Sequence, residues 1–210
     1  MHNATKYGVL LAVLAMFAIP SAGLTQPATG KVSVDLRGGV ALPAGNMATI
    51  TDIGGMAGAS AMWNFHPNWA IRADFDYMKL DDGRDGFGVL LSPPQDLMFF
   101  GGSFEVNFNA PRYQSMPFTF MLNVGAGIMN MKVDNTFDAG HPAVGFDNSY
   151  PAFQGGMKIG YQVEPWLNIF VNGTAYFILL DSADTGVFGF NFDNGWVIPV
   201  TAGVRLTFLR

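Results

Sequence analysis

The chain has 210 residues and 0 cysteines, so disulfide bridges, zinc–thiolate sites, iron–sulfur clusters and cysteine nucleophiles are excluded. Charge is scarce as well. Charged residues make up 13% of the chain, whereas a surface that meets only water usually carries about 25–35%. The formal net charge is −5 and no basic run exists, so nucleic acid is not an expected partner. Much of the outer surface is therefore expected to face something other than water.

The apolar run at the N-terminus is short. It covers Val9–Ile19, follows Lys6 and is followed by small residues and a proline. A helix needs about 20 apolar residues to cross a bilayer, so this layout predicts a secretory signal peptide over residues 1–23. An uncleaved anchor helix is the alternative. The mature domain is expected over residues 24–210.

What the chain does have is alternation. In Trp69–Met78, residues Ile71 and Phe75 fall on one face while Arg72 and Asp74 fall on the other. Successive side chains of a β-strand point to opposite faces, so this segment predicts a strand with an apolar face and a charged face. The pattern recurs and predicts eight strands: Val32–Leu42, Gly55–Phe65, Trp69–Met78, Met98–Asn109, Phe118–Met131, Phe153–Val163, Leu167–Ile178 and Trp196–Phe208.

The connections between these strands alternate in length. Short turns are expected at His66–Asn68 and Glu164–Pro165, with a somewhat longer one over 109–116. Long polar loops are expected at Pro43–Ile53, Lys79–Leu97, Lys132–Ala152 and Leu179–Gly195. Short periplasmic turns and long outer loops are typical of outer-membrane barrels, and an even strand number leaves both termini in the periplasm.

A sheet that crosses a membrane is expected to close into a barrel. Every backbone N–H and C=O inside a membrane must be paired within the protein, which a sheet achieves only by closing on itself. The sequence therefore predicts an all-β fold, an eight-stranded antiparallel up-and-down transmembrane β-barrel. Pro199 lies in the middle of the last strand, and because proline cannot donate to a ladder, a local bulge is expected there.

The polar faces of the strands are expected to line the lumen, and the apolar faces to meet lipid. Eight strands enclose a space that side chains can fill. Buried charges are tolerable only when paired, so we expect the following residues to form a closed ion-pair plug: Asp35, Arg37, Arg72, Asp74, Asp76, Glu105, Lys158 and Arg205. The alternative is a narrow path for ions or water through this network.

Aromatic residues collect near the ends of the expected strands, whereas the strand middles are richer in small and aliphatic residues. Amphipathic rings favour the headgroup level of a bilayer. Two aromatic girdles are therefore expected, formed by Trp63, Phe65, Trp69, Tyr77, Phe108, Trp166 and Trp196. The alternative is the general preference of aromatic residues for strands.

The end of the last strand resembles the C-terminal assembly signal of bacterial outer-membrane proteins. The matching positions are Thr201, Gly203, Leu206 and Phe208. The chain departs from the pattern because Leu209 and Arg210 follow the aromatic residue. The whole mature chain resembles the small eight-stranded OmpA/OmpX-like barrel superfamily. This resemblance implies an outer-membrane location, contact with outer-membrane lipid and lipopolysaccharide, and recognition by the barrel-assembly machinery. It identifies no extracellular loop partner.

The sequence contains few candidate catalytic residues. Neither His66 nor His141 is expected in a strand with Ser or Thr two residues away, so the lipid A deacylase pattern is missing. Two other combinations have residue types that catalysis uses: His141, Ser149 and Asp147 as a loop triad, and Asp74 with Asp76 as an acid–base pair. Ion pairing explains the two carboxylates more simply, and no enzymatic activity is expected.

The expected outer loops are acidic, with these aspartates in three groups: Asp81, Asp82 and Asp85; Asp134, Asp138 and Asp147; Asp181, Asp184 and Asp193. Carboxylates suit divalent cations at a lipopolysaccharide surface. Aspartate is also an ordinary turn-forming residue, and no EF-hand spacing is present, so no metal or cofactor is expected.

Three functions follow from these features. The first is a non-enzymatic integral outer-membrane protein with a structural or adhesive role, displaying its loops from a barrel with a plugged lumen. The second is a narrow porin-like channel for small solutes or ions. The third is a soluble lipocalin-like ligand-binding barrel, in which the apolar face would point inward.

Overall fold

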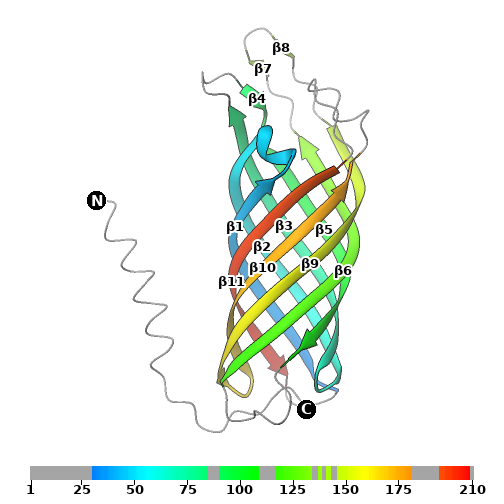
Figure 1. The fold of residues 1–210 in the computed structure, drawn as a ribbon, viewed down its shortest axis with the longest axis vertical. Coiled ribbons are helices and arrows are strands. Elements are labelled where there is room, and N and C mark those ends of the chain that lie inside the picture. The colour runs from blue at the N-terminus through cyan, green and yellow to red at the C-terminus, as the bar shows by residue number, and fades with distance from the viewer. Residues whose placement is uncertain are drawn as a thin grey trace, which may run out of the picture.

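The structure is a computed structural model and describes residues 30–84, 90–108, 117–133, 137–138, 141–142, 146–180 and 194–208. The predicted signal peptide, residues 1–23, lies outside the described residues. Long antiparallel strands close into a barrel of eight (Figure 1). They are β1 (Val32–Ala44), β2 (Thr51–His66), β3 (Trp69–Arg84), β5 (Gln95–Asn107), β6 (Phe118–Val133), β9 (Phe146–Glu164), β10 (Leu167–Leu179) and β11 (Asn194–Phe208).

The order of strands around the barrel is β2-β1-β11-β10-β9-β6-β5-β3, and β2 also pairs with β3, which closes the ring. Strands that follow one another in the chain are neighbours, and the last strand returns to the first. Every ladder between these strands is antiparallel. The fold predicted from the alternation is therefore confirmed.

Short elements gather at one end of the barrel, here called the loop end (Figure 1). They are the 3-10 helix η1 (Met47–Thr49) and the strands β4 (Leu90–Ser92), β7 (Phe137–Asp138) and β8 (His141–Pro142). The opposite end, the turn end, carries the tight turns at Pro67–Asn68 and Pro165–Trp166. Within the described residues, no helix combines the length and the apolar character needed to cross a bilayer.

The strands extend further toward the loop end than the sequence predicted. β3 continues to Arg84, and β9 begins at Phe146, so both run into segments expected to be loops. Polar residues are paired across these extensions: Lys79 lies opposite Asp96, and Lys132 lies opposite Asp147. The prediction ended the strands where the apolar residues ended. A ladder is held by backbone hydrogen bonds and by cross-strand pairs of opposite charge, which need no apolar side chain.

The bulge predicted at Pro199 is wrong. Pro199 lies opposite Ala41 in an unbroken register with β1. On the β10 side the register is the same before and after it, since Gly173 lies opposite Val200 and Tyr176 lies opposite Val197. Only the pairings between these two points are missing from that ladder. The strand thus accommodates the lost N–H donor by a local gap in hydrogen bonding, without adding a residue.

The wall separates two environments as the alternation predicted. On β3, Ile71 is 52% exposed on the outside, whereas Arg72 and Asp74 are each 4% exposed in the lumen. Large apolar side chains such as Leu122 and Val171 are also exposed on the outer surface. Soluble monomers rarely expose continuous apolar patches of more than a few hundred Å², so a wall of this kind is suited to lipid.

Candidate functional site

The lumen is divided along its length into an apolar half and a polar half. The half nearer the loop end is filled by apolar side chains, here called the apolar plug: Ala41, Met47, Met56, Met78, Leu80, Leu97, Phe99, Met129, Met131, Val133, Tyr150, Ala152, Tyr176, Ile178, Leu180 and Val197. The expectation that polar residues occupy the lumen throughout is therefore wrong for this half. Along β3 the inward positions change from Asp74 and Asp76 to Met78 and Leu80.

The 3-10 helix η1 contributes to the apolar plug at the loop end. Met47, the first residue of η1, is 1% exposed and belongs to the same buried cluster as the lumen residues. Its carbonyl accepts hydrogen bonds from the hydroxyl of Thr51 at 3.0 Å and from the backbone N–H of Ile50 at 3.1 Å. Within the plug, the rings of Phe99 and Tyr176 lie 4.9 Å apart. These contacts pack the loop half of the lumen with side chains.

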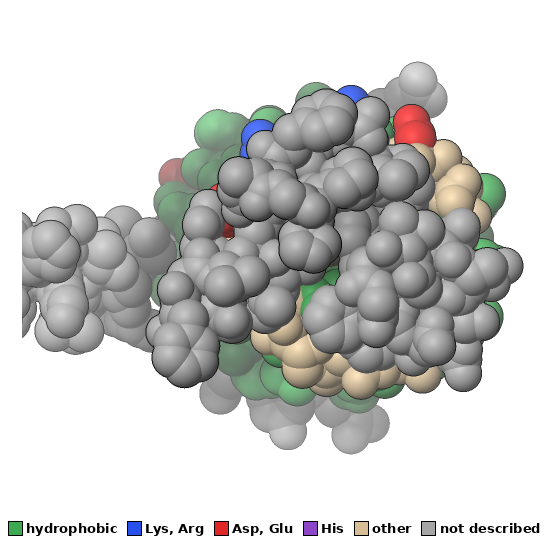
Figure 2. Space-filling view, turned by 90° about the horizontal axis from the view of Figure 1, so that it is seen from above, with side chains coloured by type: hydrophobic (Ala, Val, Ile, Leu, Met, Phe, Trp, Pro, Cys, Tyr) green, Lys and Arg blue, Asp and Glu red, His purple; other side chains and the backbone are tan. Residues whose placement is uncertain are grey.

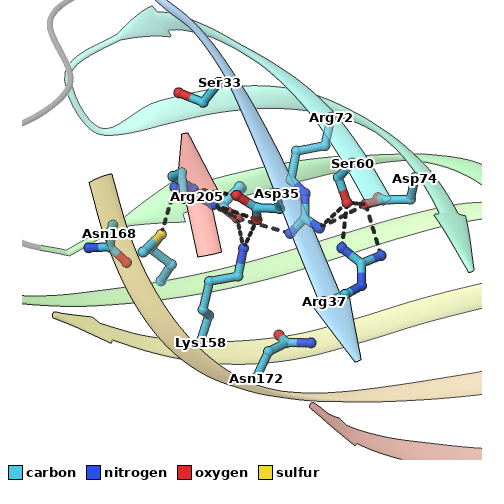
Figure 3. A network of polar contacts seen from close by, with 12 residues as sticks. Ser33, Asp35, Arg37, Ser60, Arg72, Asp74, Lys158, Asn168, Asn172 and Arg205 are labelled. Carbon is cyan, nitrogen blue, oxygen red and sulfur yellow. Dashed lines mark hydrogen bonds and ion pairs between the residues drawn. The ribbon is translucent and has the colours of Figure 1, made fainter. Parts of the chain in front are cut away.

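Below the apolar plug, the eight charged residues predicted for the lumen form one connected set, here called the lumen network. Figure 3 labels six of them: Asp35, Arg37, Arg72, Asp74, Lys158 and Arg205. Each of the eight is 7% exposed or less: Asp35, Arg37, Arg72, Asp74, Asp76, Glu105, Lys158 and Arg205. They come from β1, β3, β5, β9 and β11, on all sides of the barrel. Four are acidic and four basic, so the formal charge of the set is zero.

One part of the lumen network is centred on Asp35 and Glu105. The guanidinium of Arg205 donates to Asp35 through Nε at 2.7 Å and to Glu105 through Nη2 at 2.8 Å. Lys158 donates to Asp35 and lies 3.3 Å from Glu105. The Lys158 ammonium also lies 4.5 Å from the ring centre of Phe170, a cation–π distance. Two cations and two carboxylates thus neutralise one another in the centre of the barrel.

The other part links β1 and β3 around Asp74. Arg72 joins the two parts, because it donates to Glu105 at 2.9 Å and to Asp74 at 2.7 Å. Arg37 binds Asp76 with two bonds, at 2.9 and 2.7 Å, and its Nη2 lies 3.6 Å from Asp74. Bidentate pairs of this kind combine charge with fixed geometry. The chain of contacts therefore runs from Asp76 to Arg205 without a gap.

Neutral residues that were not among the predicted lumen residues complete the lumen network. Ser60 donates to Asp74 at 2.6 Å and also accepts from Arg72 at 3.0 Å. Gln154 donates to Asp74 at 2.8 Å, and the Tyr176 hydroxyl donates to Asp76. The alternation along each strand already places these three residues on the inward face. What the sequence lacked was the height of each residue in the barrel, which depends on the register between strands.

The outer surface carries the aromatic residues predicted for the girdles. All seven are exposed by 36% or more: Trp63, Phe65, Trp69, Tyr77, Phe108, Trp166 and Trp196. Near the turn end Trp69 stacks on Phe104 with ring centres 4.8 Å apart. Toward the loop end Phe177 lies 4.8 Å from Trp196. Seen from the loop end, hydrophobic side chains form much of the coloured outer contour, with charged side chains at the rim (Figure 2).

Comparison with solved structures identifies this architecture. Neisserial surface protein A aligns with a TM-score of 0.53 and 17% identity, over 85% of this chain and 96% of that chain. OprG from Pseudomonas aeruginosa gives 0.57 and 12%, over 89% and 100%. A major outer membrane protein from Thermus thermophilus gives 0.54 and 16%, over 85% and 99%. No family model and no curated protein matches the sequence.

The chain has the fold of the small outer-membrane β-barrels. In this barrel the residues of the lumen network face inward and the exposed large apolar residues face outward, which is the reverse of what a soluble lipocalin-like barrel requires. At the identities found, the similarity establishes the architecture.

The four residues that resemble a C-terminal assembly signal lie in β11, the strand that pairs with β1 and closes the barrel. Phe208 of β11 lies opposite Val32, Leu206 opposite Val34, and Gly203 opposite Arg37, while Thr201 lies opposite Gly39. Phe208 is 55% exposed on the outer face and Thr201 is buried. Leu209 and Arg210 lie outside the described residues. The role of these positions in assembly stays a prediction.

The structure describes some, but not all, of the side chains considered as catalytic residues in the sequence. Asp147 and Ser149 both accept from the amide of Asn130, at 2.8 and 3.3 Å, on the exposed face of the barrel. The side chain of His141 lies outside the described residues. His66 accepts the backbone N–H of Asn68 at 3.2 Å and stabilises a tight turn. The carboxylates of Asp74 and Asp76 are both engaged by arginines.

The aspartates expected in outer loops have a different placement where they are described. Asp81 and Asp82 lie in β3, and Asp147 lies in β9. In the part of the chain that the structure describes, no three histidine or acidic side chains are grouped as a metal site would require. Outside the described side chains lie Asp85, Asp134, Asp138, Asp181, Asp184 and Asp193.

Proposed function

We propose that this chain is a non-enzymatic integral protein of the bacterial outer membrane, with a structural or adhesive role. Its barrel is sealed and displays the loop end to the exterior, while both termini lie in the periplasm. One observation carries the proposal: the lumen holds a neutral ion-pair network below a packed apolar plug. Moving an ion along this path would require breaking buried pairs and then entering an apolar layer, and both steps are costly.

The rival proposal is a narrow channel, and planar bilayer recordings separate the two. The purified chain, refolded into lipid and checked by heat-modifiable mobility on a detergent gel, is expected to give no lasting conductance. Arg72→Gln is the matched variant, because Arg72 joins the two parts of the lumen network. A stable conductance in the wild type that changes in this variant would establish the channel.

The proposed partners at the loop end are outer-membrane lipid and lipopolysaccharide. Lys79 of β3 and Lys132 of β6 are exposed on the outer face, and both flank Asp96 of β5 in register. Lysine stems can lie along the apolar wall while the ammonium reaches the headgroups. This placement suits phosphate-bearing headgroups, and the Asp96 carboxylate between the two lysines accepts the Tyr77 hydroxyl at 2.8 Å.

A binding experiment tests these partners. Lys79→Gln/Lys132→Gln is expected to weaken the retention of purified lipopolysaccharide by the barrel in nanodiscs. Lys31→Gln is the control, because Lys31 precedes β1 at the turn end. Equal retention by all three proteins would contradict the proposal.

The barrel-assembly machinery is the proposed partner during biogenesis, through the four residues of β11. Phe208→Ala is expected to slow insertion in cells, and Phe108→Ala serves as the control because Phe108 has the same exposure of 55%. The adhesive role needs a separate test. Replacing residues 181–193 by a glycine–serine linker of equal length is expected to reduce attachment of cells to surfaces without reducing the amount of folded barrel.

A further inference from the structure

The lipid-facing wall contains a groove of about 710 Å³ where β5, β6, β9, β10 and β11 each contribute residues. Its sides are formed by outward side chains that are large and apolar: Phe104, Leu122, Val124, Met157 and Ile198. Its floor consists of small residues on β9 and β10, namely Gly155, Gly173 and Ala175. No charged side chain lines it.

The register of the strands explains why the small residues form a continuous floor. Gly155 lies opposite Ala175 on β10 and opposite Val124 on β6. Gly173 lies opposite Met157. Three outward positions without large side chains are therefore adjacent on neighbouring strands, and the wall is thin enough there for the inward residue Thr174 to line the groove as well.

Close packing does not account for the two glycines. A Cβ built on Gly155 or on Gly173 would meet nothing within 4 Å. By contrast, a Cβ on the inward Gly58 would lie 1.9 Å from a carboxylate oxygen of Asp76. Glycine at 155 and 173 therefore keeps a space open on the outer wall.

We propose that this groove is a seat for one acyl chain of an outer-membrane lipid. The inference rests on the proposed function, because it takes the outer wall to be surrounded by lipid. The groove is continuous with that apolar wall: Val124 and Met157 on its sides are 65% and 57% exposed. Hydrocarbon is the chemistry that an uncharged, largely aliphatic lining recognises, and a bilayer supplies it at high concentration.

A chain in the groove contacts the protein on its floor and on two sides, whereas a chain on the flat wall contacts it on one. Dispersion attraction grows with the number of neighbouring atoms, and an unfilled groove forfeits those contacts. The acyl chain lying here should therefore exchange more slowly than its neighbours. The lipid it belongs to should stay with the barrel when detergent removes the others.

The test fills the groove with side chains. Gly155→Leu/Gly173→Leu places two leucines where the structure leaves open space, so the fold is expected to persist. Gly55→Leu is the matched control: a Cβ there also meets nothing within 4 Å, and Gly55 is exposed on β2, outside the groove. The full-length protein is reconstituted in phosphatidylethanolamine vesicles, extracted in mild detergent and analysed by native mass spectrometry for bound lipid.

We expect wild type and Gly55→Leu to retain one lipid, and the double variant to retain it about tenfold less, a loss equivalent to about 1.4 kcal/mol. Equal retention in folded double variant and wild type would overturn the proposal. So would a wild-type dimer that the double variant converts to a monomer, because the groove would then seat a second copy. If the double variant does not fold, Gly173→Leu alone carries the test. Heat-modifiable mobility reports separately on whether the membrane barrel itself is correct.

Discussion

Neutralising Asp35 provides a direct measure of the lumen network. Its carboxylate is 0% exposed, accepts two bonds from Arg205 at 2.7 and 3.1 Å, and accepts a third from Lys158. Asp35→Asn keeps the shape of the side chain but leaves Lys158 and Arg205 to share Glu105. A hydrogen bond to a charged group contributes about 1.5–3 kcal/mol, and three are weakened rather than abolished. Removing one partner of a buried ion pair costs about 3–5 kcal/mol.

We therefore expect the free energy of unfolding to fall by about 4 kcal/mol in Asp35→Asn. The assay is reversible urea unfolding of the barrel in lipid vesicles, followed by tryptophan fluorescence and by gel mobility. Asp81→Asn is the control, since Asp81 is exposed at the loop end and a surface change of this kind stays within about 0.5 kcal/mol.

The double variant Asp35→Asn/Lys158→Met restores equal numbers of positive and negative charges in the lumen. It is expected to recover part of the lost stability, because it removes the cation that Asp35→Asn leaves short of a partner. If Asp35→Asn unfolds like Asp81→Asn, the lumen charges are not held in a dry, paired network, and the reasoning about a sealed barrel fails.

Four further variants test other parts of the fold by the same unfolding assay. Gly58→Ala is expected to lower the free energy of unfolding by about 1–3 kcal/mol through overpacking against Asp76. Gly55→Ala, with open space around it, should leave the free energy of unfolding unchanged or raise it by up to about 1 kcal/mol. Similar losses in both variants would refute the packing argument. Val171→Lys should lose about 2–4 kcal/mol if lipid surrounds this exposed residue, and a value near zero would indicate water. Phe99→Ala, in the apolar plug, should lose about 3–5 kcal/mol without producing a lasting conductance, because the lumen network stays closed; a new conductance would show that the plug alone seals the barrel.

The alternation of residues was enough to predict the wall. Ile71 and Phe75 face outward, and Arg72 and Asp74 face inward, as their positions in the sequence require. A strand has a period of two, so the face of each residue is a local property once the strand is recognised. The strand ends were less predictable, because backbone pairing continues through Lys79 and Lys132 after the apolar pattern has stopped.

Height along the barrel was not predictable in the same way. Asp76 and Met78 share a face and are adjacent inward positions, yet one belongs to the lumen network and the other to the apolar plug. The sequence assigns both to the lumen but does not say which residues of the other strands lie at the same level. The groove floor formed by Gly155, Gly173 and Ala175 depends on that register in the same way.

By itself, then, the sequence determined which side chains face outward and which face the lumen, because that choice depends only on strand parity. The tertiary structure alone decided which charges pair, where the apolar plug begins and where the wall is hollow. Asp35 and Lys158 are 123 positions apart in the chain, and only the closure of the barrel and the stagger between its strands bring them into contact.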